Sequence, residues 1–360
     1  MTRILFVTSN LIVGGVEKVC WEIVSNLDHK EYQCDFLVGI DEDCKQYYEE
    51  KLKVLGCNIY KGGYIIGSAG KRKFLGRERE ILREKRYDVV HSHLDMMNAS
   101  ILRVAKQEKV KTRVSHVHLT FPNYDSWSVI SKVKHWIQVE AIKTFGTHLL
   151  GCSKQACQEH YGKTNRAEVL FNGFDIERFL QLPSVNKNPY KLITIGRICH
   201  QKNPEFIIDV MKYLVQKDSR YELYWIGDGD LREKAQAKIL DNNLAENVHM
   251  IGQTTEIEQY LQKCGVALFP SVYEGLGIAI VETQLAGCYT FYSNVVPDEA
   301  DVGFGMKLSL GDGSEAWASV IDSTIKNNEL ASARIDMGKA KRYDVHSMVC
   351  RIKEIYGTGR

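Results

Sequence analysis

The sequence predicts an α/β protein built from two doubly wound parallel sheets, one in each half of its 360 residues. Three observations support this prediction. Short apolar runs alternate with longer segments of helical periodicity, an order typical of parallel sheets. A strand–loop–helix unit opens each half, starting at Ile4 and again at Leu192. The chain is also too long for one ordinary core, because single cores stop growing near roughly 250–300 residues.

The predicted strands are short apolar runs separated by segments long enough for helices. In the first half they lie at 4–7, 34–38, 89–91, 113–116 and 148–151. In the second half they lie at 192–195, 223–226, 248–251, 266–269 and 289–292, with helices near 231–240, 257–263 and 278–285. The polar, proline-containing segment 180–190 is the predicted linker. We therefore predict domains at 1–185 and 186–340, followed by a last helix within 341–360.

The composition is that of an ordinary folded protein, with 44% hydrophobic and 26% charged residues. A formal net charge of +2 gives no general attraction to nucleic acid, so no nucleic-acid partner is expected. The ten cysteines include no Cys-x-x-Cys pair, which argues against a zinc site and predicts reduced thiols. No apolar stretch reaches the ~18 residues of a membrane span. We therefore expect a cytoplasmic protein that does not cross the bilayer.

The strongest chemical signal lies in residues 270–287, PSVYEGLGIAIVETQLAG. Glu274 precedes Gly275 and Gly277 in a predicted loop, and Glu282 follows on an apolar helix. Carboxylates accept hydrogen bonds from hydroxyl groups, so one glutamate could hold a sugar and the other a ribose. The glycine amides would stay open to the same ligand. Glu282 alone could be a helix-surface carboxylate, but its apolar neighbours predict burial, and a buried glutamate needs a partner.

Two cations follow the first predicted strand of the second half. Arg197 stands directly after Gly196, and Lys202 lies five residues later in the loop before a helix that begins near Pro204. Two cations beside a helix start can clamp a diphosphate. In isolation, a pair of solvated loop charges is an equal alternative. The carboxyl end of a strand, where open α/β sheets bind ligands, favours the clamp.

Gly14 and Gly15 occupy the corresponding loop of the first half. Glycines let a ligand approach the backbone amides at a helix N-terminus, where anions are favoured. The glycine fingerprint of dinucleotide-binding proteins is absent, and a Gly-Gly turn can equally be structural.

Two His-x-His pairs end predicted strands of the first half, namely His91 with His93 and His116 with His118. Alternate strand residues share one face of a sheet, so the four side chains could form a metal site. Carboxylate ligands at a recognisable spacing are missing apart from Asp95. We therefore predict no metal and interpret the histidines as core or site residues.

Together these motifs resemble the retaining glycosyltransferases of family 4, which have the GT-B fold, and specifically the capsular or exopolysaccharide branch. The resemblance spans nearly the whole chain and rests on GGVEK, NGFD, GRICHQKNP, IGDGD and the segment 270–287. It implies two Rossmann-like domains facing across a cleft, with the last helix crossing back to the first domain. It also implies that no metal is required.

The resemblance assigns roles in donor binding to four side chains of the second half. It implies that Arg197 and Lys202 bind the donor diphosphate and stabilise the charge that grows as the bond breaks. Glu282 would bind the nucleotide ribose, and Glu274 would contact the sugar hydroxyls.

The roles implied for the first half concern the acceptor and the transferred sugar. Gly14 and Gly15 would lie beside the phosphates or the acceptor. His118 matches the histidine that approaches the transferred sugar, although His116, two residues away, could take that place instead.

The implied reaction transfers a hexose or N-acetylhexosamine with retention at the anomeric carbon. The donor would be a nucleotide-diphosphate sugar, by family analogy a UDP-sugar, and the acceptor a lipid-linked or polysaccharide-precursor saccharide. No cofactor beyond this donor substrate is expected. The alternatives are a nucleotide-sugar epimerase of related fold and a catalytically silent sugar-nucleotide-binding partner of another transferase.

Two segments predict contact with an anionic membrane surface. Residues 71–86 hold eight basic and three acidic residues, and residues 127–136 combine two tryptophans with Lys132 and Lys134. Cationic amphipathic surfaces with interfacial tryptophans suit anionic headgroups. The alternative is a solvated helix face with core tryptophans. We accordingly expect peripheral association with the inner face of the plasma membrane.

Overall fold

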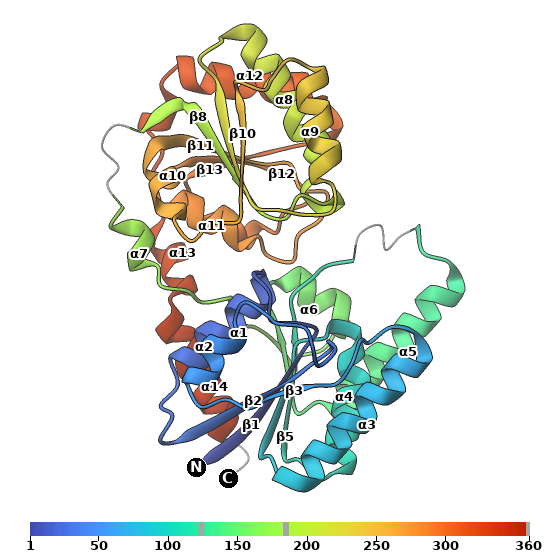
Figure 1. Cartoon of the computed structure of the whole chain (residues 1–360). Helices are drawn as coiled ribbons and strands as arrows, with labels where there is room; N and C mark the ends of the chain where they lie inside the picture. Colours follow the sequence, from blue (N-terminus) through green and yellow to red (C-terminus); the bar gives the residue numbers. More distant parts are fainter. Residues whose placement is uncertain (122–125, 183–186, 358–360) are drawn as a thin grey trace. The chain divides into compact units, whose positions relative to one another are not determined.

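The computed structural model describes residues 1–121, 126–182 and 187–357, which divide into two compact units (Figure 1). The first unit comprises Met1–Phe174 and Tyr343–Arg360, and the second comprises Asp175–Arg342. The boundary predicted near 186 falls on residues outside the described ones. The second unit begins earlier because helix α7 (Glu177–Leu180) packs against helix α11 (Ile278–Leu285) of that unit.

The first unit contains a seven-stranded sheet in which every adjacent pair of strands is parallel. The strand order is β3-β2-β1-β4-β5-β6-β7. Its strands are β1 (Thr2–Thr8), β2 (Tyr32–Val38), β3 (Ile59–Lys61), β4 (Val89–Ser92), β5 (Thr112–Val117), β6 (His148–Gly151) and β7 (Ala167–Val169). Ile4, Leu5 and Phe6 are fully buried, as expected for a central parallel strand covered on both faces.

Helices connect the strands of the first unit. They are α1 (Gly15–Ser25), α2 (Glu49–Val54), α3 (Gly67–Lys85), α4 (Asn98–Gln107), α5 (Val129–Phe145) and α6 (Lys154–Tyr161), with a 3-10 turn, η1, at Asp95–Met97. Helices α3, α4 and α5 pack in succession, and Figure 1 shows them together on one side of the sheet. Helix α4 thus lies between its two longer neighbours.

The second unit repeats the architecture with six parallel strands in the order β10-β9-β8-β11-β12-β13. The strands are β8 (Asn188–Ile195), β9 (Glu222–Ile226), β10 (Val248–Gly252), β11 (Cys264–Phe269), β12 (Tyr289–Ser293) and β13 (Gly305–Leu308). The other helices are α8 (Pro204–Lys217), α9 (Arg232–Asp241), α10 (Ile257–Lys263), α12 (Gly313–Lys326) and α13 (Met337–Ala340). The prediction of two doubly wound parallel sheets is therefore confirmed.

The last helix, α14 (Val345–Gly357), packs against α1 in the first unit. Arg351 forms a two-pronged ion pair with Glu168 of β7, with N–O distances of 2.7 and 2.8 Å. The hydroxyl of Tyr356, a buried residue, lies 2.8 Å from Nδ1 of His91 in β4. Polar and apolar contacts thus anchor the carboxyl-terminal helix to the first sheet.

Both sheets reverse their strand order beside the first strand of the unit, between β1 and β4 and between β8 and β11. Ligands of open α/β sheets bind outside the carboxyl ends of strands at such a switch point. The loops after these four strands are therefore the places to search for a site. Within the described residues, no helix has both the length and the apolar character needed to span a bilayer.

Candidate active site

The switch point of the second sheet brings together the loop that carries the two predicted cations and the loop that carries Glu274. One loop follows β8 and runs from Gly196 to the 3-10 turn η3 (His200–Lys202), where α8 begins at Pro204. The other follows β11 and ends at Gly277, the residue before α11. Because β8 and β11 are adjacent parallel strands, both loops leave the same edge of the sheet.

Lys202 and Glu274 meet at this edge as an ion pair between Nζ and Oε1. The Ser271 hydroxyl donates to the same carboxylate oxygen at 2.8 Å, and Gln201 Nε2 donates to Oε2 at 3.3 Å. The side chain of Glu274 is only 6% exposed, whereas that of Lys202 is 19% exposed. The carboxylate is thus held from three directions, and the ammonium stays within reach of solvent.

Glycines make room for this arrangement. Gly196 has φ +149°, and a Cβ on it would come within 2.9 Å of Cε of Lys202. A Cβ on Gly227 would come within 2.1 Å of the carbonyl oxygen of Gly196, so the close approach of the loops after β8 and β9 requires glycine at position 227. Gly277, the residue before α11, has φ +85°, a left-handed conformation that favours glycine.

The other predicted donor-binding residues lie on the same two loops and on α11. Arg197 is exposed and makes no ion pair or side-chain hydrogen bond within the part of the chain that the structure describes. Gly275 is buried between Glu274 and Gly277. Glu282 is buried in α11, with 7% exposure, as its apolar neighbours predicted.

The four histidines form a buried cluster at the carboxyl ends of β4 and β5 in the first unit. His91 Nε2 lies 3.3 Å from His116 Nδ1, and His93 Nδ1 lies 2.8 Å from His118 Nε2. The rings within each of these two pairs are stacked, with interplanar angles of 10° and 15°. Asp95 Oδ1 accepts a 3.0 Å hydrogen bond from the backbone amide of His118.

Burial keeps these imidazoles neutral. Removal from water lowers the pKa of His91, His93 and His116 well below the usual histidine value. Burial lowers the pKa of His118 to about 3 and raises that of the Asp95 carboxyl to about 6. A neutral imidazole can still exchange hydrogen bonds with a sugar hydroxyl.

The histidine cluster could also hold a metal ion. One nitrogen from each of His91, His93 and His116 lies within 4.8 Å of the other two. Nε2 of His93 and Nε2 of His116 have no hydrogen-bond partner within the described chain. The expectation that no metal is needed stays a prediction.

Comparison with known proteins identifies the family of the chain. Residues 13–178 match the family model described as Glycosyltransferase Family 4, and residues 175–341 match the model described as Glycosyl transferases group 1. The chain belongs to the family-4 glycosyltransferases. The solved structure of Anabaena HepE in complex with UDP and glucose has the same GT-B fold as this glycosyltransferase. It superposes with a TM-score of 0.78 at 17% identity over 98% of this chain and 99% of HepE.

Two curated relatives extend the comparison. The glycosyltransferase is 24% identical to CapH of Staphylococcus aureus, described as a capsular polysaccharide biosynthesis glycosyltransferase, over 99% of each chain. It is 27% identical, over 77% of each chain, to an Escherichia coli protein. That protein is named UDP-Gal:alpha-D-GlcNAc-diphosphoundecaprenol alpha-1,3-galactosyltransferase.

In the first unit of the glycosyltransferase, Gly14 and Gly15 stand where the sequence predicted them, at the start of α1 after β1. Glu17, in the first turn of α1, is buried, and its Oε2 would lie 2.3 Å from a Cβ on Gly14. This acidic side chain already complements the positive end of the helix. The loop is therefore better suited to hydroxyl groups than to a phosphate.

Sequence reasoning about the glycosyltransferase missed several supporting residues. Ser271 and Gln201 both hold the carboxylate of Glu274, and Tyr356 contacts the histidine cluster from the last helix. Ser271 could have been found, because it lies three residues before Glu274 in the same loop. Tyr356 gives no such signal, since 265 residues separate it from His91.

Proposed function

We propose that the protein transfers a hexose or N-acetylhexosamine, with retention, from a nucleotide-diphosphate sugar to a lipid-linked or polysaccharide-precursor acceptor. The observation that carries this proposal is the Lys202–Glu274 pair at the switch point of the second sheet. A cation that is partly open to solvent can take a diphosphate, and Arg197 on the same loop adds a second charge. A UDP-sugar is the proposed donor.

The residues divide the donor between them. As the glycosidic bond to the diphosphate breaks, negative charge grows on the leaving oxygens, and Arg197 with Lys202 stabilises it. Glu274 and Glu282 offer carboxylate oxygens to hydroxyl groups, the first to the sugar and the second to the ribose. None of these steps needs a metal, so we propose a metal-independent reaction.

Relatives support the proposed substrates. The name of the Escherichia coli protein specifies a UDP-sugar donor and a saccharide on a diphospholipid acceptor, and HepE was solved with UDP and glucose. In the first unit, the neutral imidazole of His118 or His116 is the proposed contact for the transferred sugar. The loop at Gly14 and Gly15 is proposed to face the acceptor.

Calorimetry with nucleotides tests the donor proposal. We expect the protein to bind a nucleoside diphosphate at least about tenfold more tightly than the matching monophosphate, because only the diphosphate spans both cations. UDP, GDP and UMP are the probes, and Arg197→Ala should remove most of the difference. No measurable binding of any of the three to folded protein would contradict the proposal.

A panel of nucleotide sugars then separates transfer from the alternatives. A transferase releases nucleotide faster when a membrane lipid extract is added. An epimerase forms a new nucleotide sugar without an acceptor, and a silent binding partner turns over nothing. The anomeric configuration of the product, read by NMR, tests retention.

We further propose that the protein is cytoplasmic and associates peripherally with an anionic membrane through α5. This helix leaves five apolar side chains between 50% and 77% exposed, namely Val129, Ile130, Val133, Trp136 and Ile137. Their spacing places them along one stripe of the helix. The opposite face, with Val139 and Ile142, is buried. Exposed apolar stripes of this size mark binding surfaces.

The two predicted membrane segments differ in character. Helix α3, which holds most of residues 71–86, buries its apolar side chains, including Phe74 and Ile81. Arg79 and Arg83 form ion pairs with Glu108, so these two positive charges of the segment are partly neutralised within the first unit. In this proposal α5 inserts side chains, whereas α3 contributes only electrostatic attraction.

Flotation with anionic liposomes tests the α5 surface. We expect Ile130→Glu with Ile137→Glu to abolish flotation at low and high salt, because the helix then cannot insert its apolar stripe. The matched control is Leu240→Glu with Val54→Glu, which also adds two charges, since Leu240 on α9 and Val54 on α2 are 58% and 86% exposed. Flotation of the double variant at the wild-type level would overturn the proposal.

A further inference from the structure

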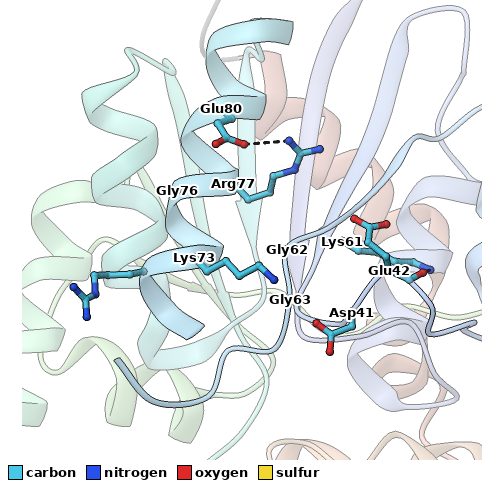
Figure 2. A pocket seen from close by; sticks show the side chains of 10 residues that line it. Asp41, Glu42, Lys61, Gly62, Gly63, Lys73, Gly76, Arg77 and Glu80 are labelled. Atoms are coloured by element: carbon cyan, nitrogen blue, oxygen red, sulfur yellow. Dashed lines mark hydrogen bonds and ion pairs between the residues drawn. The ribbon is translucent and has the colours of Figure 1, made fainter. Parts of the chain in front are cut away.

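A pocket of about 480 Å³ opens at the carboxyl ends of β2 and β3, at one edge of the first sheet (Figure 2). One wall is the loop after β2, with Asp41 and Glu42, and the opposite wall is α3. Gly62 and Gly63, directly after β3, lie between the two walls. None of the residues assigned above to donor or sugar binding lines this pocket.

The two walls carry opposite charge. On α3, Arg72 and Lys73 are exposed and make no ion pair or side-chain hydrogen bond within the described residues. Arg77 forms an ion pair with Glu80 on the same exposed face, and its guanidinium lies 6.0 Å from the centre of the Tyr60 ring. Exposed ion pairs of this kind contribute little. Three cations on α3 are therefore available to a ligand.

The loop that forms the acidic wall is held in place by Lys61, whose ammonium group is therefore not available to a ligand. Lys61 donates to the carbonyl oxygens of Glu42 and Cys44 at 2.9 and 2.7 Å and lies 3.3 Å from a carboxylate oxygen of Glu49. Its charge is thus used to fix the loop. The carboxylates of Asp41 and Glu42 make no ion pair within the described chain.

Glycines keep the basic wall accessible. Lys73 extends over Gly63, where a Cβ would lie 3.0 Å from its Nζ, and Gly63 has φ +79°. Gly76 sits within α3 with no atom within 4 Å of its absent Cβ. A glycine inside a helix costs about 1 kcal/mol relative to alanine. Here it leaves a gap in the helix surface between Lys73 and Arg77.

We propose that this pocket binds the phosphate-linked sugar of the acceptor. The phosphate oxygens contact Arg72, Lys73 and Arg77, and hydroxyl groups of the adjoining sugar donate to Asp41 and Glu42. A simple anion would be repelled by the acidic wall, and an uncharged sugar would leave the cations unused. A ligand with both groups satisfies both walls. This inference rests on the proposed function, because it names the acceptor as a glycosyl phosphate or diphosphate.

The test compares a pocket variant with a charge-matched control. Lys73→Ala with Arg77→Ala removes two cations from the pocket. Arg103→Ala with Lys111→Ala removes two exposed cations from the same unit, outside the pocket. We expect the pocket variant to raise KM for a detergent-solubilised, diphosphate-linked saccharide by roughly 10- to 100-fold, the effect of losing one or two charge-assisted contacts. Its kcat and its KM for the donor should not change, and neither should any constant of the control.

Soluble probes test whether the pocket recognises the sugar phosphate itself when no lipid is present. N-acetylglucosamine 1-phosphate and its neutral methyl glycoside are titrated without lipid and followed by NMR. We expect binding of the phosphate alone, lost in the pocket variant and weakened in Asp41→Asn. Equal binding of both compounds, or binding unaffected by the pocket variant, would overturn the proposal.

Failure of this inference can be told apart from failure of the proposed function. If UDP binds and nucleotide is released but the pocket variant behaves as the control does, only the pocket assignment is wrong. If no nucleotide binds, the transferase proposal fails, and the NMR titration with the sugar phosphate still decides whether the pocket binds its ligand.

Discussion

Lys202→Ala is expected to lower kcat by at least about 100-fold while leaving a folded protein, because removal of one preorganised charge contact costs roughly 100- to 1,000-fold in related cases. The ammonium is held by Glu274 at the end of β8 and remains partly exposed, so it is positioned before the donor arrives. A large effect on kcat, and not only on KM, would show that the charge acts on the departing diphosphate. Steady-state kinetics with the best donor from the panel gives both constants.

Glu274→Ala is expected to cause a similar loss for a different reason. It removes the carboxylate that Ser271, Gln201 and Lys202 hold in place. Because the two side chains are ion-paired, their effects should be coupled, and the double variant should lose less than the product of the two single-variant losses. The ion pair is partly exposed, so unfolding free energy should fall by only about 1.5–3 kcal/mol, a typical value for a charged hydrogen bond.

The exposed Lys217 at the end of α8 provides the control, since Lys217→Ala removes the same charge from the same unit. Its rate should equal that of the wild type. Wild-type turnover in well-folded Lys202→Ala or Glu274→Ala protein would contradict the assignment. Additive losses in the double variant would mean that the two side chains work separately.

The main strands and several helices could be predicted because buried segments need apolar residues, which form recognisable runs and periodic patterns in the sequence. The predicted runs at 4–7 and 266–269 lie within β1 and β11, which are apolar because both faces of a parallel sheet are covered. The strands that were missed, β3, β7 and β13, are three or four residues long. Each is an edge strand, with a neighbouring strand on one side only. Their residues are only partly buried, so no apolar pattern distinguishes them.

The candidate site was predictable in its residues and not in its contacts. Arg197, Lys202 and Glu274 carry recognisable spacing in the sequence, but the distance between positions 202 and 274 hides their pairing. The pairing follows from strand order, because β8 and β11 are neighbours although β9 and β10 separate them in the chain. Likewise, the contact between Tyr356 and His91 depends on the return of α14 to the first unit.

The second large effect that we expect is a loss of stability of the first unit as the pH falls. His91, His93, His116 and His118 are neutral in the fold because burial lowers their pKa values. In the unfolded chain each takes up a proton near pH 6.5. Since the unfolded state then binds more protons, stability is fully present above pH 6.5 and is lost as pH falls toward the folded pKa values. Between pH 7.5 and 5.5 the four groups should remove about 5 kcal/mol.

Asp95 acts in the opposite direction. Burial raises the pKa of its carboxyl to about 6, so between that value and its unfolded pKa the folded state binds the extra proton. As the pH falls, protonation of Asp95 therefore raises the free energy of unfolding by the contribution of at most one titrating group. The four histidines lower it by the contribution of four. The net effect remains a large destabilisation of the first unit, which is a substantial part of the 5–15 kcal/mol typical of a domain.

Hydrogen exchange of the amides in β4 and β5, measured with a chelator present, follows the first unit alone. Protection should fall steeply between pH 7.5 and 5.5 after correction for the intrinsic exchange rate. His116→Gln should make the slope shallower by about one proton, or about 1.4 kcal/mol per pH unit, because one titrating group is gone. His346→Gln, at an exposed position of α14, is the matched control. If protection is flat across this range, the histidines do not stay neutral in the fold, and a neutral imidazole cannot be the contact for the transferred sugar.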